Sequence, residues 1–482
     1  MNIINSYYDL GKEFYEKQLP DKIRQPKLFL FNQELARQLD LGVDYDSKYL
    51  SDIFSGNKLL VNSKPIALAY AGHQFGHFIS RLGDGRAILL GEIKDKNDCL
   101  FDIQLKGSGK TFFSRNGDGK YPLGAAIREY IMGEAMYFLQ VSTTRSLAIV
   151  KSGELIQREN PVLAGISTRI AKSHIRVGTF EYFFSRGDIK NLKILADYTI
   201  NRHFPKYYLG HNKYLHLLKS VTELQIELVT SWLSIGFIHG VMNTDNTSIC
   251  GQTLDYGPCA FMDEYKSNQV FNFIDKTGRY SFINQRNITL WNITRFAETL
   301  VPFIDRDPKK SINILENELA QFLTLFDRVY YQKMAKKLGL CTISKEKDKV
   351  LINDYLEILE KGKIDFTNGF RGLSKELLER NNTKKKNSIE FSWHQKWRQR
   401  LLEQRIDVKK IAAQMNTVNP ILIPRNHVIA NIIRCAIHNQ DYKMLKEFLR
   451  IIRNPFIEKK RYQKYYRPAN SNEKVIHTFC GT

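Results

Sequence analysis

The residues best suited to carry chemistry lie in one stretch, GFIHGVMNTDNTSICGQTLDYG (236–257). His239 is followed seven residues later by Asn246, and Asp255 opens the triplet DYG shortly after. Carboxamide and carboxylate oxygens are ligands that Mg²⁺ prefers, with phosphate oxygens completing the shell. Asn and Asp also gather in turns, but that explains each residue singly and not this spacing after an apolar helix. The stretch therefore predicts a metal-assisted phosphate site.

The spacing matches a protein-kinase catalytic loop, H-R-D-x-x-x-x-N followed by D-F-G, with one residue changed. Val241 stands where such a loop carries its catalytic Asp. A positioned base contributes roughly 10²–10⁴-fold to proton transfer, and an aliphatic side chain cannot supply it. Either the site is catalytically silent or it performs a different transfer with another base. The retained Asn246 and Asp255 favour the second interpretation, and Asp245 is the spare carboxylate nearby.

Two glycine-rich turns lie earlier in the chain. Gly83 and Gly85 precede a strand-like run, and Asp118 and Gly119 lie within SRNGDGKYPLG. Glycine lets backbone N–H groups approach a phosphate without a Cβ clash. Arg86 follows the first turn and could hold a phosphate oxygen through two hydrogen bonds. Read alone, a G-x-G favours a simple turn, so these residues support a phosphate site only in combination.

Further cations belong to the same β-rich region. Lys106 ends the strand-like FDIQLKG, and kinases orient such a lysine with a helix glutamate. Glu129 lies 23 residues on in a predicted helix, and Glu134 is the competing candidate. Arg169 and Arg176 are seven residues apart in STRIAKSHIRVGTFE. With Lys106 they could form a cradle for polyphosphate, and the alternative is that they are solvated surface charges.

Composition limits the classes of partner. The chain has 482 residues, 43% of them hydrophobic, and 72 Lys and Arg against 50 Asp and Glu give a net charge of +22. The surplus suits nucleic acid or phosphate-rich ligands, but abundant Lys, Asn and Ile also indicate a general compositional bias. No nucleic-acid module is recognisable, so we do not expect nucleic acid as a partner. Six cysteines without a C-x-x-C pair, and no long apolar run, predict a soluble cytoplasmic protein without a membrane partner.

The order of elements predicts an α+β, protein-kinase-like two-lobed fold with terminal extensions. We expect a helical or irregular N-terminal extension over 1–60, a β-rich nucleotide-binding lobe over 61–190, and a helical lobe over 191–482 with the catalytic loop and a C-terminal tail. Strands are predicted over 86–93, 99–107, 145–150 and 164–173, and helices over 125–140, 216–237, 292–304, 315–339 and 354–362. The polar tract 380–388 is predicted to be an exposed loop.

Several long motifs occur in a fixed order. They are AYAGHQFGHF (69–78), LGDGRAILLGE, DIQLKGSG, REY, STRIAKSHIRVGTFE, HGVMNTDN, DYGP and the final HTFCGT. NPILIPRN (419–426) is a weaker match nearer the C-terminus. Together they resemble the selenoprotein O family, also called YdiU. The resemblance implies a pseudokinase-fold enzyme that binds ATP in an inverted orientation. Such an enzyme transfers AMP, or in bacterial members UMP from UTP, to Ser, Thr or Tyr hydroxyls of proteins and releases pyrophosphate.

The resemblance also implies roles for individual residues. Asp245 would accept the proton, Asn246 and Asp255 would bind Mg²⁺ or Mn²⁺, and Glu129 would pair with Lys106. The implied nucleotide ligands are Gly83, Gly85, Arg86, Lys106, Asp118, Gly119, Arg169, Arg176 and Asp255. Inversion would explain Val241, because a base suited to the γ-phosphate is misplaced when the α-phosphate faces the acceptor.

A redox role of the tail is less well supported. Cys480 stands where animal members of the family carry selenocysteine, and some bacterial members are thought to pair this cysteine with one in the activation segment. That segment here, EYKSNQVFNFIDKTGRY, contains no cysteine, so we expect a free tail thiol.

Other interpretations stay open at this point. The main alternative is a catalytically silent ATP-binding scaffold, and an ordinary kinase would require Asp245 to act at the γ-phosphate. The sequence does not choose between AMP and UMP or between Mg²⁺ and Mn²⁺. We expect protein acceptors as partners and a monomeric chain.

Overall fold

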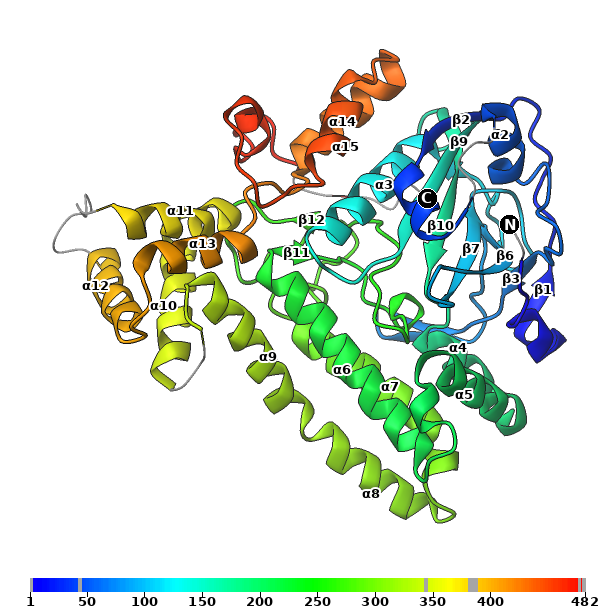
Figure 1. Ribbon diagram of the computed structural model, residues 1–482. Coiled ribbons are helices and arrows are strands. Elements are labelled where there is room, and N and C mark those ends of the chain that lie inside the picture. Colours follow the sequence, from blue (N-terminus) through cyan, green and yellow to red (C-terminus); the bar gives the residue numbers. More distant parts are fainter. Residues whose placement is uncertain (1–2, 42–45, 342–345, 380–388, 476–477, 479–482) are drawn as a thin grey trace.

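The computed structural model describes residues 3–41, 46–341, 346–379, 389–475 and 478. The predicted loop over 380–388 and the tail thiol Cys480 lie outside these residues. The fold is mixed, with the strands concentrated in the N-terminal part and helices forming the C-terminal part (Figure 1). No helix in the described parts of the chain is both long and apolar enough to cross a membrane.

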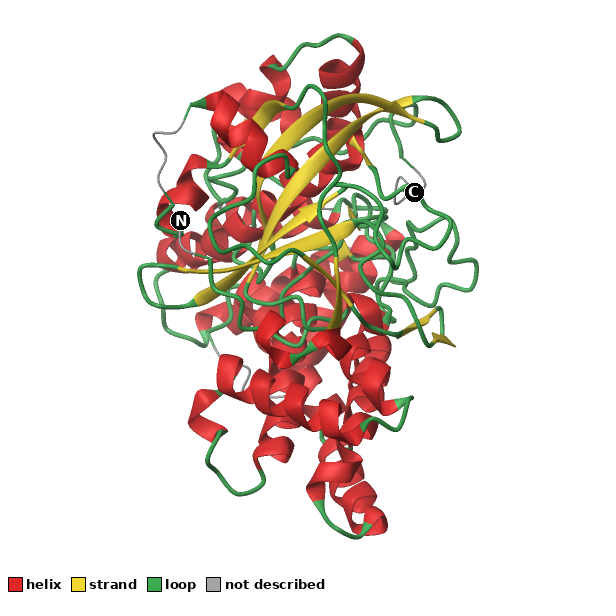
Figure 2. Cartoon of the chain, turned by 90° about the vertical axis from the view of Figure 1, so that its right-hand side faces the viewer, coloured by secondary structure: helices red, strands yellow, loops and turns green. Residues whose placement is uncertain are grey.

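The N-terminal part is built on one antiparallel sheet with strand order β1-β3-β6-β7-β10-β9-β2, with β8 paired to β10. Figure 2 shows its strong twist above the helical part. The predicted strands over 86–93, 99–107, 145–150 and 164–173 are confirmed as β6, β7, β9 and β10. The bounds are β1 Tyr15–Lys17, β2 Lys27–Phe31, β3 Ile66–Leu68, β6 Ala87–Lys94, β7 Leu100–Lys106, β8 Tyr121–Pro122, β9 Arg145–Ile156 and β10 Val162–Ala171.

The expectation of a helical or irregular lead-in over 1–60 is wrong for two segments. β1 pairs with β3, and β2 pairs with β9, so both strands belong to the main sheet. Each is short, and its partner lies far along the chain, so no local pattern signals it. The helices here are α1 Gln33–Gln38 and α2 Ser47–Ser55, after 3₁₀ turns at Tyr8–Leu10 and Lys12–Phe14.

Helix α3, Leu123–Phe138, confirms the helix predicted over 125–140 and packs on β9 and β10. It buries nearly its whole length, including Ile127, Ile131 and Met132. Removing each such side chain from water stabilises the fold by about 1.5–3 kcal/mol. The sheet and α3 therefore form a rigid frame for the charged side chains that β7 and α3 carry.

Helices account for most of the remaining chain. α6 confirms the helix over 216–237, α7 that over 292–304, and α10 that over 354–362. The single helix predicted over 315–339 is interrupted at residues 320–321, where the N–H of Gln321 bonds to the carbonyl of Glu318. The bounds are α4 Val177–Phe184, α5 Ile189–His203, α6 Lys213–Ser234, α7 Gln285–Ile304, α8 Pro308–Leu319, α9 Phe322–Lys337, α10 Glu346–Lys361, α11 Phe366–Leu378, α12 Ile389–Leu402, α13 Val408–Val418, α14 Asn426–His438 and α15 Lys443–Ile451, with 3₁₀ turns at Pro205–Tyr207, Thr244–Asn246 and Lys460–Tyr465.

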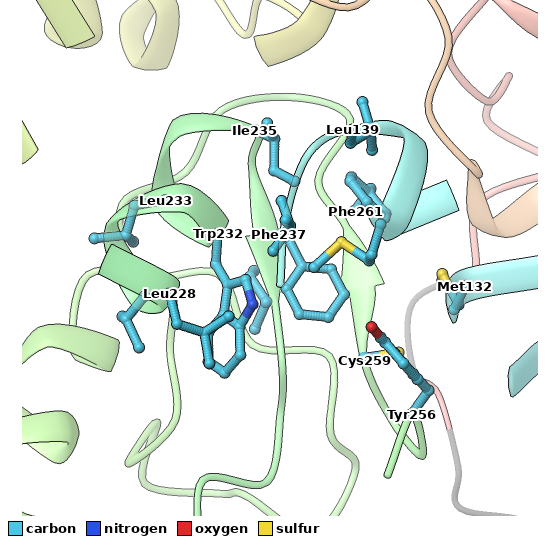
Figure 3. Packing of buried hydrophobic residues seen from close by; sticks show 14 of the residues in the cluster. Met132, Leu139, Leu228, Trp232, Leu233, Ile235, Phe237, Tyr256, Cys259 and Phe261 are labelled. Atoms are coloured by element: carbon cyan, nitrogen blue, oxygen red, sulfur yellow. The ribbon is translucent and has the colours of Figure 1, made fainter. Parts of the chain in front are cut away.

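The stretch 236–257 is anchored on an apolar cluster at the end of α6 (Figure 3). Strand β11, Phe237–Ile238, pairs with β12, Ala260–Phe261, so both ends of the intervening loop are fixed. The Trp232 ring lies 5.6 Å from that of Phe237, and its indole Nε1 donates to the Thr253 hydroxyl over 3.0 Å. The polar loop is thus held by packing rather than by its own turn residues.

Candidate active site

His239 is part of the frame of the loop. Its side chain is buried, stacks on Trp232 at 5.3 Å, and its Nε2 lies 2.9 Å from the Leu254 carbonyl oxygen. Burial lowers the pKa of His239, so the ring stays neutral and fixes the backbone next to Asp255. The Asn246 amide donates to the Val241 carbonyl over 3.2 Å.

Three cations converge on Asp255. Lys106 Nζ lies 2.8 Å and Arg169 Nη1 2.7 Å from Oδ1, and Arg176 Nη1 lies 3.2 Å from Oδ2. Burial opposes ionisation of Asp255, but Arg169, Lys106 and Arg176 outweigh it and hold its pKa well below the usual range. In this arrangement the carboxylate contacts the three cations for which the sequence predicted phosphate contacts.

Lys106 has a second partner from α3. Its Nζ lies 2.9 Å from Glu129 Oε2, to which the Tyr121 hydroxyl also donates over 2.8 Å. Burial raises the pKa of Glu129, but Lys106 and Arg169 outweigh this and lower it. The competing candidate Glu134 points elsewhere and pairs with Arg145 at 2.7 Å. The geometry thus selects Glu129 as the residue that orients Lys106.

Asp245 is buried and lines the same space, and its backbone carbonyl accepts from Arg176 over 2.7 Å. The Gln74 amide donates to its Oδ2 over 3.3 Å, while its Oδ1 has no hydrogen bond within the described chain. Burial, partly offset by Arg176, raises the pKa of Asp245 to about 6. A carboxylate with this pKa is ionised at neutral pH and basic enough to accept a proton from an attacking hydroxyl.

Both glycine-rich turns pack closely against neighbouring segments of the chain. A Cβ on Gly83 would lie 2.2 Å from the Phe113 ring, and one on Gly119 would lie 2.0 Å from the Gly109 carbonyl oxygen. Both glycines have φ near +70°, a region that other residues rarely adopt. Asp118 bonds the backbone N–H of Lys120 and pairs with Arg158 at 2.8 Å, and that Arg158 interaction lowers its pKa.

These walls enclose a polar cavity of about 920 Å³, large enough for a nucleoside triphosphate. Glu129 is the one predicted site residue outside its lining; it lies behind Lys106. The predicted residues that line the cavity are Gly83, Gly85, Arg86, Lys106, Asp118, Gly119, Arg169, Arg176, Asp245, Asn246 and Asp255, together with Val241.

Sequence reasoning missed several polar neighbours. Asp84 accepts from the Gln104 amide over 2.8 Å, and Gln104 in turn accepts from Arg169 over 2.6 Å. Asp84 and Gln74 lie inside motifs noted in the sequence, so their position was a usable signal. Tyr121, whose ring lies 5.0 Å from both the Arg86 guanidinium and Lys106 Nζ, lies inside the glycine-rich stretch SRNGDGKYPLG, so its position was a usable signal as well.

The donors on the loop suit a hard divalent cation only in part. No group of three His, Cys, Asp or Glu side chains that could hold a metal occurs in the described chain. Asn246 and Asp255 both line the cavity and carry oxygen atoms that could serve as ligands, and Mg²⁺ commonly completes its shell with substrate phosphates and water. The residues therefore fit a metal that arrives with a nucleotide rather than one held by the protein alone.

The cavity, its cations and the buried carboxylate define a class of protein: one that binds a polyanionic ligand beside a group able to accept a proton. The family described as protein adenylyltransferase SelO matches residues 1–453. The protein belongs to this family.

Curated relatives match over nearly their whole length. The chain is 45% identical to the protein nucleotidyltransferase YdiU of Rhodopseudomonas palustris strain CGA009, covering 99% of this chain and 98% of the relative. Proteins of the same name from Syntrophotalea carbinolica and Clostridium botulinum strain Alaska E43 are each 44% identical, covering 100% of this chain and 97% and 98% of the relatives.

Proposed function

We propose that this protein is an enzyme that transfers AMP, or UMP, from a nucleoside triphosphate to hydroxyl groups of proteins. Family membership over 453 residues supports the activity, and the names of the relatives support a protein acceptor. The observation that carries the proposal is that Asp245 faces the same cavity as the cations, where Val241 replaces the base of a kinase. We also propose that the two parts correspond to kinase-like lobes, divided near residue 190.

The chemistry follows from the positions of the side chains. Arg86, Lys106, Arg169 and Arg176 would bind the β- and γ-phosphates, which leaves the α-phosphate toward Asp245. An acceptor hydroxyl would lose its proton to Asp245 while its oxygen bonds to the α-phosphorus. The bond between that phosphorus and the bridging oxygen would break, and pyrophosphate would leave.

A divalent cation, Mg²⁺ or Mn²⁺, would be held by Asn246 and Asp255 together with the phosphates. When bound, it supplies positive charge that stabilises the transferred phosphoryl group. Asp255 would then exchange some of its contacts with Lys106, Arg169 and Arg176 for the metal, and these cations would turn to the phosphates. We expect the enzyme to act as a monomer in the cytoplasm.

The position of the radioactive phosphate in the nucleotide tests the proposal. Incubated with a protein acceptor, the enzyme should transfer radioactivity from α-labelled ATP or UTP and none from γ-labelled ATP. Asp255→Ala and Asp245→Asn should each abolish transfer, while binding of a fluorescent ATP analogue reports whether the cavity remains. Transfer from γ-labelled ATP would indicate a kinase, and nucleotide binding without any transfer would support the silent scaffold.

A further inference from the structure

Arg279 is a partly buried arginine close to the catalytic loop. Its Nε is buried without a hydrogen bond, and no Asp or Glu of the described chain lies within ion-pair distance of its guanidinium. The residue as a whole is partly exposed, so the end of its guanidinium is open to an anion from outside the described chain.

The guanidinium lies close to two other groups besides the Tyr280 ring. Its Cζ lies 4.8 Å from the centre of the Trp291 ring and 5.8 Å from that of Tyr280. A Cβ on Gly76 would lie 3.5 Å from Cζ and 3.6 Å from each Nη. Three nearly equal distances mean that the plane faces Gly76. With the face toward Gly76 covered, the Nη edge, which forms no ion pair in the described chain, remains for a planar, two-bonded partner such as a carboxylate.

The acidic side chains around Arg279 are already engaged. Asp275 accepts the backbone N–H groups of Arg279 and Tyr280, each over 2.8 Å, instead of pairing with the guanidinium. Glu298 pairs with Arg295 at 2.6 Å, and Glu181 lies 2.5 Å from His73. None of these carboxylates forms an ion pair with the Arg279 guanidinium in the described chain.

Two contacts place Arg279 beside the proposed base. The Tyr280 hydroxyl donates to Asn243 Oδ1 over 2.6 Å, and Asn243 is two residues before Asp245. Gly76, which the guanidinium faces, is two residues after Gln74, whose amide bonds Asp245. Two extended residues span at most about 7 Å. Arg279 does not line the nucleotide cavity, so it lies within a few residues' reach of the base but outside the nucleotide site.

We propose that Arg279 recognises the acceptor protein by binding an Asp or Glu side chain a few residues from the hydroxyl that is modified. The inference rests on the proposed function and adds a rule of specificity to it. A two-bonded Arg–carboxylate contact at a partly buried position both attracts acidic segments and fixes their register. The enzyme should accordingly prefer hydroxyls in acidic surroundings.

A peptide series tests this rule. Each peptide carries one Ser and differs only in having Glu, Ala or Lys at one position near it. With α-labelled ATP, the wild-type enzyme should favour Glu over Lys at one or two positions by about tenfold or more, as expected for a close charge pair. Arg279→Glu should reverse the preference, so that peptides with Lys are favoured over those with Glu. Arg279→Lys should weaken the preference, because lysine keeps the positive charge but loses the paired N–H donors of the guanidinium.

Controls separate this inference from the proposed function. Arg461→Glu makes the same charge change at an arginine that also lies on a ring, 4.8 Å from that of Tyr462 in the C-terminal part, and should keep the wild-type preference. ATP affinity should be equal in all variants. A wild-type preference that survives Arg279→Glu, or no preference at all, would overturn the role of Arg279 alone. Absence of any transfer by the wild type would overturn the proposed function and this inference with it.

Discussion

At the residue scale, the site sets buried cations against buried carboxylates. Lys106, Arg169 and Arg176 are each 6% exposed or less at the side chain, and Asp255 contacts all three, with Glu129 and Asp84 as further acidic neighbours. Triphosphate oxygens would offer the same cations more contacts. On the proposed function, the Asp255 carboxylate would occupy the place of a phosphate and would become free for a metal when the nucleotide supplies the negative charge.

The Lys106–Glu129 pair gives the prediction at this scale. Glu129→Ala removes the partner of Lys106 and of the Tyr121 hydroxyl in a buried place, where breaking a pair costs about 3–5 kcal/mol. Glu129→Gln keeps the hydrogen bonds and should cost less than half of this. Urea denaturation measures the stability, and ATP titration should show weaker binding for both variants. Equal stability of Glu129→Ala and the wild type would contradict the pairing.

At the scale of elements, the β4–β5 hairpin, Gly72–Gln74 and His77–Ile79, covers the proposed base. Gly72 contacts Asp245 so closely that an added Cβ would lie 2.8 Å from Oδ1 and 2.9 Å from its Cβ. The His73 backbone N–H also donates to the Thr244 hydroxyl over 2.7 Å. This hydrogen bond helps to hold the hairpin at its close distance from Asp245. The hairpin and the loop thus position each other.

Gly72→Ala should therefore displace Asp245 or the hairpin. We expect kcat for nucleotide transfer to fall by about 10²-fold, because small misplacements of a base are costly, while ATP affinity changes little. Gly372→Ala is the matched control, since nothing lies within 4 Å of a Cβ in that helix and alanine stabilises a helix by roughly 0.5–1 kcal/mol. If both variants have the kcat of the wild type, the hairpin does not position Asp245.

The strands and helices differ in how well the sequence predicts them. β6, β7, α3 and α6 were predictable because their apolar periodicity is local and strong. β1 and β2 were not, because their stability comes from pairing with β3 and β9, remote in the chain. The cations of the site were visible through their motifs, whereas the contact of Gln74 with Asp245 depends on tertiary packing over 171 residues.

At the scale of the whole molecule, one buried arginine joins the catalytic segment to the C-terminal helices. Arg425 caps α14, is fully buried, and donates to Asp263, which closely follows β12. It also bonds both oxygens of Asp365, the N-cap of α11, over 2.7 and 3.0 Å. The segment that follows Asp255 is therefore tied to α11 and α14 through one guanidinium.

Replacing that guanidinium should loosen the whole assembly. Arg425→Leu leaves the Asp365 carboxylate buried without its counter-charge, so we expect a loss of about 3–5 kcal/mol and a clearly lower thermal midpoint. Adding Asp365→Asn should restore part of the stability, because the orphaned charge is removed, and the double-mutant cycle measures the coupling. Arg453→Leu breaks an ion pair with Glu34 whose side chains are 48% and 35% exposed, and it should cost less than about 1 kcal/mol. If Arg425→Leu destabilised the protein no more than Arg453→Leu, the buried Arg425 interactions would not hold these parts together.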